Sequence, residues 1–251
     1  MIEVKSLYKS FEDKQVLCDI NATFNNGTTN LIIGQSGSGK TVLMKCIVGL
    51  FEPTRGNIFY DNRDFVGMNK IERIKLRREM GMIFQNAALF DSMSVLENVM
   101  FPLDMFSNDT YTDRLKRARF CLDRVNLSDA EKKFPGEISG GMQKRVAIAR
   151  AIALNPKYLF CDEPNSGLDP KTSLVIDELI HDITKDFNIT TIINTHDMNS
   201  VMGIGENIIY ICEGWKEWQG NKDQIMTATN EKLNSFIFAS DLFRKVKEAN
   251  K

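Results

Sequence analysis

The feature that most restricts the possible folds is a glycine-rich run, Gly34-Gln35-Ser36-Gly37-Ser38-Gly39-Lys40-Thr41. It follows a short apolar segment, 29–33, and precedes a segment with helical periodicity, 40–50. Strand, glycine-rich turn and helix in this order predict a phosphate-binding loop at the edge of a parallel α/β sheet. A glycine-rich turn that binds nothing is the alternative, and the flanking strand and helix argue against it.

The chemistry of phosphate binding explains the composition of this run. Glycines lack Cβ, so successive backbone N–H groups can turn toward phosphate oxygens, and the helix that follows adds unpaired amides at its positive end. Lys40 supplies a mobile charge for the β- and γ-phosphates, and the Thr41 hydroxyl suits Mg²⁺. The run therefore predicts a nucleotide site, in a class that includes kinases, GTPases and many ATPases.

Bulk composition excludes several classes of protein. The chain has 251 residues, of which 43% are hydrophobic and 26% charged, as in an ordinary globular protein. Its formal net charge of -1 argues against a nucleic-acid partner held by bulk charge. The five cysteines include no Cys-x-x-Cys pair, which indicates reduced, buried thiols. No signal peptide and no window near the ~18 apolar residues of a membrane span is present, so any membrane crossing falls to another chain.

A pair of carboxylates narrows the class. The apolar segment 158–161 leads directly into Asp162 and Glu163, and a strand there brings both to its carboxyl end, where such sheets bind ligands. Asp162 suits the Mg²⁺ shell, through water, and Glu163 suits a general base that polarises the attacking water. Alone, this sequence is more typical of a surface turn. The phosphate-binding loop upstream favours the functional interpretation.

A second glycine-led helix start lies about a hundred residues after the first. Ser139, Gly140 and Gly141 precede a helix that we expect to begin near Met142 and to continue through Arg150. Its free amides and dipole predict a second anion site, and one terminal phosphate shared by two sites suggests two chains that share ATP. The alternative is an N-cap by Ser139, worth ~1 kcal/mol, which explains the serine but not both glycines.

With these motifs in this order, the chain resembles the ABC ATPase family over nearly its whole length. The resemblance implies that Gln85 links Mg²⁺ and the water to a helical subdomain, that His196 contacts the γ-phosphate, and that Asp169 belongs to a loop at a dimer interface. It also implies that Phe11 stacks on adenine beside Val16. Phe11 alone could equally be a core residue, and His196 alone a structural one. Met142 departs from the family, which usually has glutamine there. The matching series is the phosphate-binding loop, Phe84-Gln85, Ser139-Gly140-Gly141, Asp162-Glu163, Ser166-Gly167-Leu168-Asp169 and Thr195-His196-Asp197.

The predicted fold class is α/β: a P-loop NTPase of RecA type with a mostly parallel sheet, an antiparallel β edge and an inserted helical subdomain. Further strands are expected at 158–161, 190–194 and 208–212, and helices at 112–125 and 142–154. One ABC ATPase domain spans 1–251. Within it, we expect an α/β core at 1–85 and 155–222, a helical and signature subdomain at 86–154, and a helical tail at 223–251.

The segment 86–103 and the Ser-Gly-Gly-Met variant are similar to ATPases of Mce-type phospholipid transporters, of the MlaF type. That resemblance implies a peripheral ATPase on the cytoplasmic face of the inner membrane, energising phospholipid transport between inner and outer membranes. The expected partners are a second copy of the chain, integral permease chains and an Mce-type lipid-binding protein, with Trp215, Trp218 and 236–243 as a further subunit contact. The alternatives are an ATPase of a small-solute importer, for example for an amino acid, and a regulatory or non-transport cassette.

Overall fold

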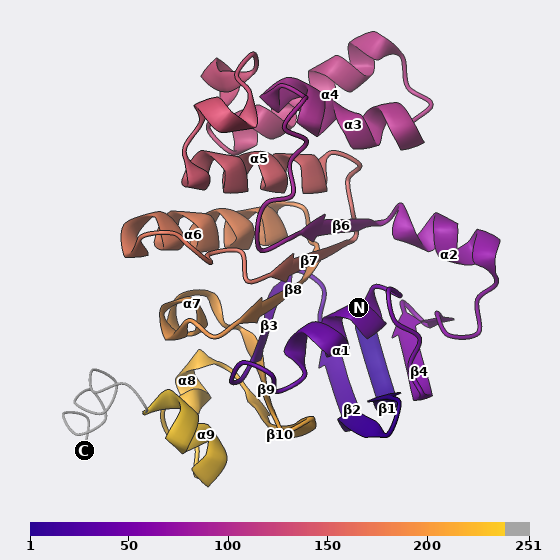
Figure 1. Cartoon of the computed structure of the whole chain (residues 1–251), viewed down its shortest axis with the longest axis vertical. Coiled ribbons are helices and arrows are strands. Elements are labelled where there is room, and N and C mark those ends of the chain that lie inside the picture. The colour runs from indigo at the N-terminus through magenta and orange to yellow at the C-terminus, as the bar shows by residue number, and fades with distance from the viewer. Residues whose placement is uncertain (239–251) are drawn as a thin grey trace. The chain divides into compact units, whose positions relative to one another are not determined.

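The computed structural model describes residues 1–238, which form two compact units: 1–68 with 192–238, and 69–191 (Figure 1). Each unit has its own buried apolar residues. The last part of the predicted tail, 239–251, and with it Phe243, lies outside the described residues.

The first unit contains an antiparallel sheet with the strand order β2-β1-β4-β5. Strand β1 pairs with β2 on one side, with Ile2 opposite Phe24, and with β4 on the other, with Ile2 opposite Tyr60. This sheet is the antiparallel edge that the resemblance implied. The bounds of its strands are β1 Ile2–Phe11, β2 Lys14–Phe24, β4 Arg55–Tyr60 and β5 Arg63–Asp64.

A second set of strands in the same unit has the order β10-β9-β3-β8. Strand β3 runs parallel to β9, and β10 returns antiparallel to β9. The apolar side chains of β3 and β9 are almost fully buried, which explains the apolar run 208–211 in β9 and the apolar end of β3 at 31–33. The strands are β3 Thr28–Ile33, β8 Thr190–Thr195 (its first two residues belong to the other unit), β9 Asn207–Cys212 and β10 Trp215–Gly220.

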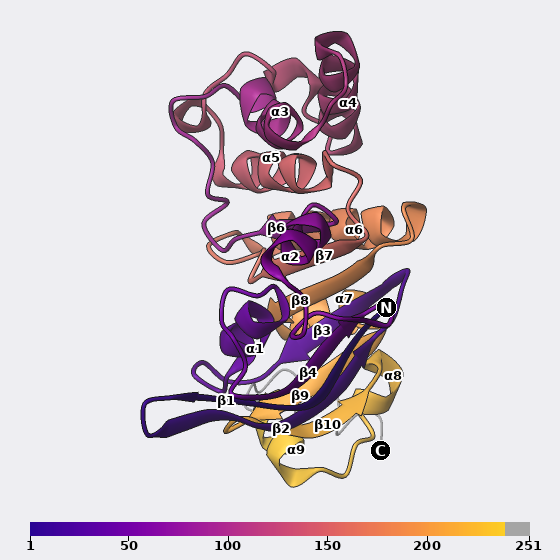
Figure 2. The same ribbon diagram turned by 90° about the vertical axis from the view of Figure 1, so that its right-hand side faces the viewer.

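Short helices complete the first unit (Figure 2). Helix α1 is shorter than the predicted 40–50, because Gly49 at φ 76° takes a left-handed conformation that ends it. In the predicted tail, Phe236 stacks on Tyr210 with ring centroids 5.4 Å apart, so the start of the tail packs on its own unit. The helices are α1 Lys40–Ile47, α7 Met198–Ile204, α8 Lys222–Ile225 and α9 Glu231–Ile237.

The second unit has two parallel strands, β6 and β7, and most of the helices. Helices α3, α4 and α5 pack against one another, and α5 also contacts α6 and β6 (Figure 1). No strand occurs between 86 and 154, all of which the structure describes. The elements are α2 Lys70–Arg77, β6 Met80–Ile83, α3 Val95–Phe106, α4 Tyr111–Arg124, the 3₁₀ helices η1 Ser128–Ala130 and η2 Pro135–Glu137, α5 Gly140–Ile152, β7 Tyr158–Asp162 and α6 Pro170–Asp186.

Composition predicted that the chain has no membrane-spanning segment and that its cysteines are reduced and buried. No helix within residues 1–238 has the length and apolar character needed to cross a bilayer. All five cysteines lie in this range as free thiols, four of them buried, and Cys212 half-buried. Burial raises the pKa of Cys46 and of Cys121 to about 11, which is the behaviour of inert core thiols.

Candidate functional site

In the first unit, the glycine-rich run forms a tight loop between β3 and α1. Gly34, Gly37 and Gly39 have φ values of 151°, 79° and 110°, all in the region that favours glycine. A Cβ at Gly34 would lie 2.2 Å from the backbone oxygen of Ile211, so only glycine fits there. Gly39 occupies the N-cap of α1 and, as a glycine, offers no side-chain acceptor to the first amides of the helix.

Two polar groups inside the loop fit a phosphate ligand. The Lys40 ammonium donates to the carbonyl oxygens of Gly34 at 2.8 Å and Gln35 at 2.9 Å, so the loop itself holds this charge over its centre. The buried Ser38 hydroxyl has no hydrogen-bond partner among the described residues. A buried polar group without a partner is rare in proteins, and a phosphate oxygen would satisfy it.

Val16 and Phe11 lie on different parts of the same hairpin. A Cβ at Gly39 would approach the Val16 carbonyl oxygen to 3.2 Å, which places β2 directly beside the loop. Phe11, at the end of β1, is 38% exposed, with an edge-on contact to Phe51 at 5.1 Å and the Lys9 ammonium 4.6 Å from its ring. The partly exposed ring of Phe11 could stack on a base, as the resemblance implies; that role stays a prediction.

His196 follows β8 directly and is exposed at the start of α7. Asp197 caps α7 by accepting from the Asn199 amide at 2.8 Å, and its own amide donates to the Thr195 hydroxyl at 3.0 Å. Asn194 precedes His196 by two residues, and its side-chain amide nitrogen lies 3.7 Å from the Met44 sulfur on α1. The end of β8 therefore packs on the helix that follows the phosphate-binding loop, within the same unit.

In the second unit, the loops after β6 and β7 meet. The Gln85 side-chain amide donates to the Ser166 hydroxyl at 3.0 Å and to a Glu163 carboxylate oxygen at 3.5 Å. Glu163 has φ 48°, a left-handed conformation that is unusual for a residue with a side chain. Asp162 is the last residue of β7. The structure thus brings Gln85 next to Glu163 and Ser166, which follow it by 78 and 81 positions in the sequence.

The loop that follows Glu163 is fixed at both ends. The Asn165 amide donates to the buried Asp177 carboxylate at 2.7 Å, and Asp169 caps α6 by accepting from the Lys171 and Thr172 amides at 3.1 and 3.0 Å. The hydrogen bond from the Thr172 hydroxyl lowers the pKa of Asp169 most, and bonds from backbone amides lower it further. Asp169 therefore stays ionised. A dimer-interface role for Asp169 stays a prediction.

The second glycine-led helix, α5, begins at Gly140, two residues earlier than predicted. Ser139 caps it by accepting from the Met142 amide at 3.3 Å, so the N-cap of the alternative interpretation is present. A Cβ at Gly141 would lie 2.7 Å from the Thr172 methyl group of α6, whereas Gly140 meets nothing closer than 3.9 Å. Packing against α6 therefore gives Gly141 a structural role that the sequence did not suggest.

Two functional candidates were missed by sequence reasoning. The Ser166 hydroxyl accepts from Gln85, although the motif series gave this serine no role. Lys144 of α5 is 5% exposed, its ammonium donates to the Gln85 carbonyl oxygen, and burial lowers its pKa. The available signal was a lysine in a helix that is otherwise largely buried, and such a residue needs an internal acceptor.

The ABC transporter family profile matches residues 17–166, more than half of the chain. The chain belongs to the ABC transporter family. As the ATP-binding cassette of that family it binds ATP with Mg²⁺ and hydrolyses it. The match spans the phosphate-binding loop, Gln85, the α5 start and the two carboxylates after β7.

Individual relatives of the cassette agree with this. It is 35% identical over 236 residues to a probable ribonucleotide transport ATP-binding protein of Mycobacterium leprae, covering 94% of this chain and 68% of that protein. It is 40% identical over 212 residues to a methionine import ATP-binding protein of Clostridium tetani, covering 84% of this chain and 66% of that protein. The chain thus spans about two thirds of both relatives. A dimeric, post-hydrolysis structure of the cassette MJ0796 with ADP and Pi has a TM-score of 0.79 at 33% identity, covering 88% of this chain and 99% of that chain.

Proposed function

We propose that this cassette works as a homodimer in which each ATP contacts the phosphate-binding loop of one copy and the α5 start of the other. A two-fold pair uses the same surface twice, so two identical ATP sites result. Loss of the γ-phosphate would remove the attraction that joins the copies. The solved dimeric state of MJ0796 supports this arrangement.

The proposed roles within one copy follow the chemistry of phosphoryl transfer, in which positioning and charge stabilisation dominate. Lys40 and residues 34–39 hold the phosphates, and Phe11 with Val16 holds the base. Mg²⁺ would neutralise phosphate charge, and its proposed ligands are Thr41, Gln85 and, through water, Asp162. His196 contacts the γ-phosphate. The residues of the other copy that contact this ATP are Ser139, Gly140, Gly141 and Asp169.

The hydrogen-bonded group of Gln85, Glu163 and Ser166 carries the proposal. Glu163 would accept a proton from the attacking water, and the Gln85 amide, 3.5 Å from its carboxylate, would orient that water. Holding both groups before the reaction reduces the reorganisation needed in the transition state.

Glu163→Gln tests this mechanism. The substitution keeps the shape and removes the base, so ATP hydrolysis should fall at least ~100-fold while ATP binding remains. The variant should also elute as a dimer in size-exclusion chromatography when ATP is present. Glu178→Gln, on the exposed face of α6, is the matched control and should behave as the wild type. Wild-type hydrolysis by Glu163→Gln would contradict the assignment of the base.

We further propose that the cassette energises phospholipid transport of the Mce type, as a peripheral subunit on the cytoplasmic face of the inner membrane. The support is the similarity of 86–103 and of the Ser-Gly-Gly-Met sequence to the ATPases of those systems. Its partners would be permease chains and an Mce-type lipid-binding protein. The names of the curated relatives favour import of a small solute, such as an amino acid, as the second candidate.

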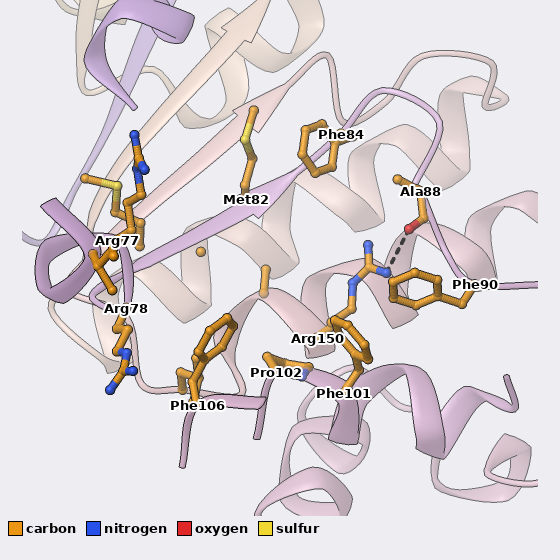
Figure 3. A pocket seen from close by; sticks show the side chains of 15 residues that line it. Arg77, Arg78, Met82, Phe84, Ala88, Phe90, Phe101, Pro102, Phe106 and Arg150 are labelled. Carbon is orange, nitrogen blue, oxygen red and sulfur yellow. Dashed lines mark hydrogen bonds between the residues drawn. The ribbon is translucent and has the colours of Figure 1, made fainter. Parts of the chain in front are cut away.

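A groove in the second unit supports a membrane-subunit partner (Figure 3). It has a volume of about 540 Å³, an aromatic lining that includes Phe101 and Phe106, and the arginines Arg77 and Arg78 at one side. Phe106 and Phe90 are 45% and 40% exposed, so the groove offers apolar surface. An amphipathic helix of a permease, with an acidic residue facing the arginines, would suit this lining.

Lipid analysis of the intact complex tests the cargo. The tagged chain would be purified in detergent from its native membrane, together with its permease, and the bound molecules extracted and identified. Phospholipid retained above a detergent control supports the Mce-type assignment. If the complex instead contained an amino acid and no Mce-type protein, the chain would be assigned to a small-solute importer.

A further inference from the structure

Two consecutive residues after Gln85 have a backbone conformation that residues with side chains rarely adopt. Ala87 has φ 58° and Ala88 has φ 50°. Both are left-handed, neither is glycine, and each such residue is disfavoured in the absence of supporting contacts. The loop's own backbone supplies part of the support, since the Ala87 amide donates to the Phe84 carbonyl oxygen at 3.0 Å and the Ala88 amide to the Asn86 carbonyl oxygen at 2.6 Å. Further support comes from outside the loop, at the carbonyl oxygens of Ala87 and Ala88. Ala87 lies only two residues after Gln85, whose side chain approaches Glu163.

Arg150 on α5 supplies that support. Its guanidinium donates to the Ala88 carbonyl oxygen at 2.8 Å (Figure 3). It also donates to the Ala87 carbonyl oxygen at 2.8 Å. It also lies 5.9 Å from the centre of the Phe90 ring. The planar guanidinium has donors at fixed angles, so one side chain can bind both carbonyls at the same time.

The chemistry of this contact differs from an ordinary surface ion pair. Arg150 contacts two carbonyl oxygens and an aromatic ring, groups that carry no formal charge. Burial lowers its pKa, which shows that the charge is partly removed from water. One and a half turns earlier on the same helix, Lys144 donates to the Gln85 carbonyl oxygen. Helix α5 thus binds the loop at three carbonyl oxygens, those of residues 85, 87 and 88.

We propose that Arg150 is a positioning residue for Gln85. By holding Ala87 and Ala88 left-handed, it fixes the backbone from which the Gln85 side chain reaches Ser166 and Glu163. Arg150 also forms part of the groove wall, so a helix in the groove would touch the group that sets Gln85. The inference rests on ATP hydrolysis by the cassette and does not depend on its cargo.

The first experiment replaces Arg150 by lysine in the purified full chain. A lysine keeps the charge but cannot bind both carbonyls in the fork geometry. We expect kcat for ATP hydrolysis to fall about tenfold, with KM for ATP changed less than about twofold. Arg145→Lys is the matched control, since Arg145 lies on the same helix and donates to the Val125 and Asn126 carbonyls at 3.3 and 3.2 Å. Its kcat should stay within about twofold of the wild type. Equal losses in both variants would overturn the proposal.

A double-mutant cycle separates positioning from general stability. If Arg150 acts through Gln85, Arg150→Lys should lower kcat much less in a Gln85→Ala background than in the wild type. An equal factor in both backgrounds would overturn the proposal.

A rescue measurement covers the case in which Arg150→Lys folds poorly. Ala88→Gly removes the penalty for the left-handed conformation, so adding it to Arg150→Lys should raise kcat at least about threefold. Absence of rescue would show that Arg150 has another task. The test of Arg150 can be told apart from the test of the base. If Glu163→Gln still hydrolysed ATP, the base would be wrong, but the kcat values of the Arg150 and Gln85 variants could still be compared.

Discussion

Helices α1 and α5 both begin at glycine residues, but their first amide groups have different partners. At α1, the N-cap is Gly39 with φ 110°, which makes no side-chain hydrogen bond to the helix. At α5, the Ser139 hydroxyl accepts from the Met142 amide at 3.3 Å. The glycines differ as well: those before α1 are required by backbone conformation, whereas Gly141 has an ordinary helical conformation and is required by the Thr172 methyl group.

A helix that starts at glycines can therefore bind a ligand only, or it can bind a ligand and also stabilise the fold. The N-cap of α1 offers no side-chain acceptor, and the buried Ser38 hydroxyl nearby has no hydrogen-bond partner within residues 1–238. The α5 start is partly satisfied by its own serine and packs closely on α6. Substitutions at α1 should therefore affect nucleotide binding most, whereas those at α5 should combine a loss of stability with a loss of activity.

The largest effect is expected from Gly34→Ala. Its Cβ would lie 2.2 Å from the Ile211 backbone oxygen, which cannot move without displacing β9. Overpacking of about 1–3 kcal/mol at the loop itself should weaken ATP binding by roughly 10- to 100-fold, measured by titration of a fluorescent ATP analogue. Gly37→Ala is the matched control, because its Cβ would meet nothing within 4 Å and only its φ of 79° opposes the change. Equal losses at both positions would show that backbone conformation, and not the close contact, decides.

A smaller effect is expected at the α5 start. Gly141→Ala places a Cβ 2.7 Å from the Thr172 methyl group, so the free energy of unfolding should fall by about 1–3 kcal/mol. Thr172→Ser keeps the hydroxyl that bonds to Asp169 and removes the methyl group, so it should restore stability in the double variant. Urea unfolding measures both. If the ATPase rate recovers together with stability, Gly141 serves only the packing of α5 on α6.

The smallest effect is expected from Ser139→Ala. Loss of an N-cap costs ~1 kcal/mol, which lowers Tm by roughly 2–4 °C in a chain of this size. Thr110→Ala removes the cap of α4, where Thr110 accepts from the Asp113 amide at 3.2 Å, and should lower Tm similarly. Only Ser139→Ala should also lower the rate of ATP hydrolysis. A pair of variants with equal Tm and equal rates would limit Ser139 to the role of a cap.

Much of the fold could be predicted because its signals are local. The strands at 28–33, 158–162, 190–195 and 207–212 lie within one residue of the expected runs, because each contains at least two consecutive buried apolar residues. The helix after Ser139 began two residues early and α1 ended three residues early, because caps and a left-handed glycine set those ends. The domain boundaries expected at 85 and 154 stay a prediction.

The phosphate-binding loop, the order of the motifs and the family could be predicted from the sequence, because glycine spacing and strand-turn-helix patterns are local and specific. Only the tertiary structure decided that Gln85 reaches Ser166 and Glu163, that Thr172 excludes a side chain at Gly141, and that Arg150 binds the carbonyls of Ala87 and Ala88. These contacts join residues about 30 to 80 positions apart. Their geometry depends on how helices and strands pack, and no spacing within one segment encodes it.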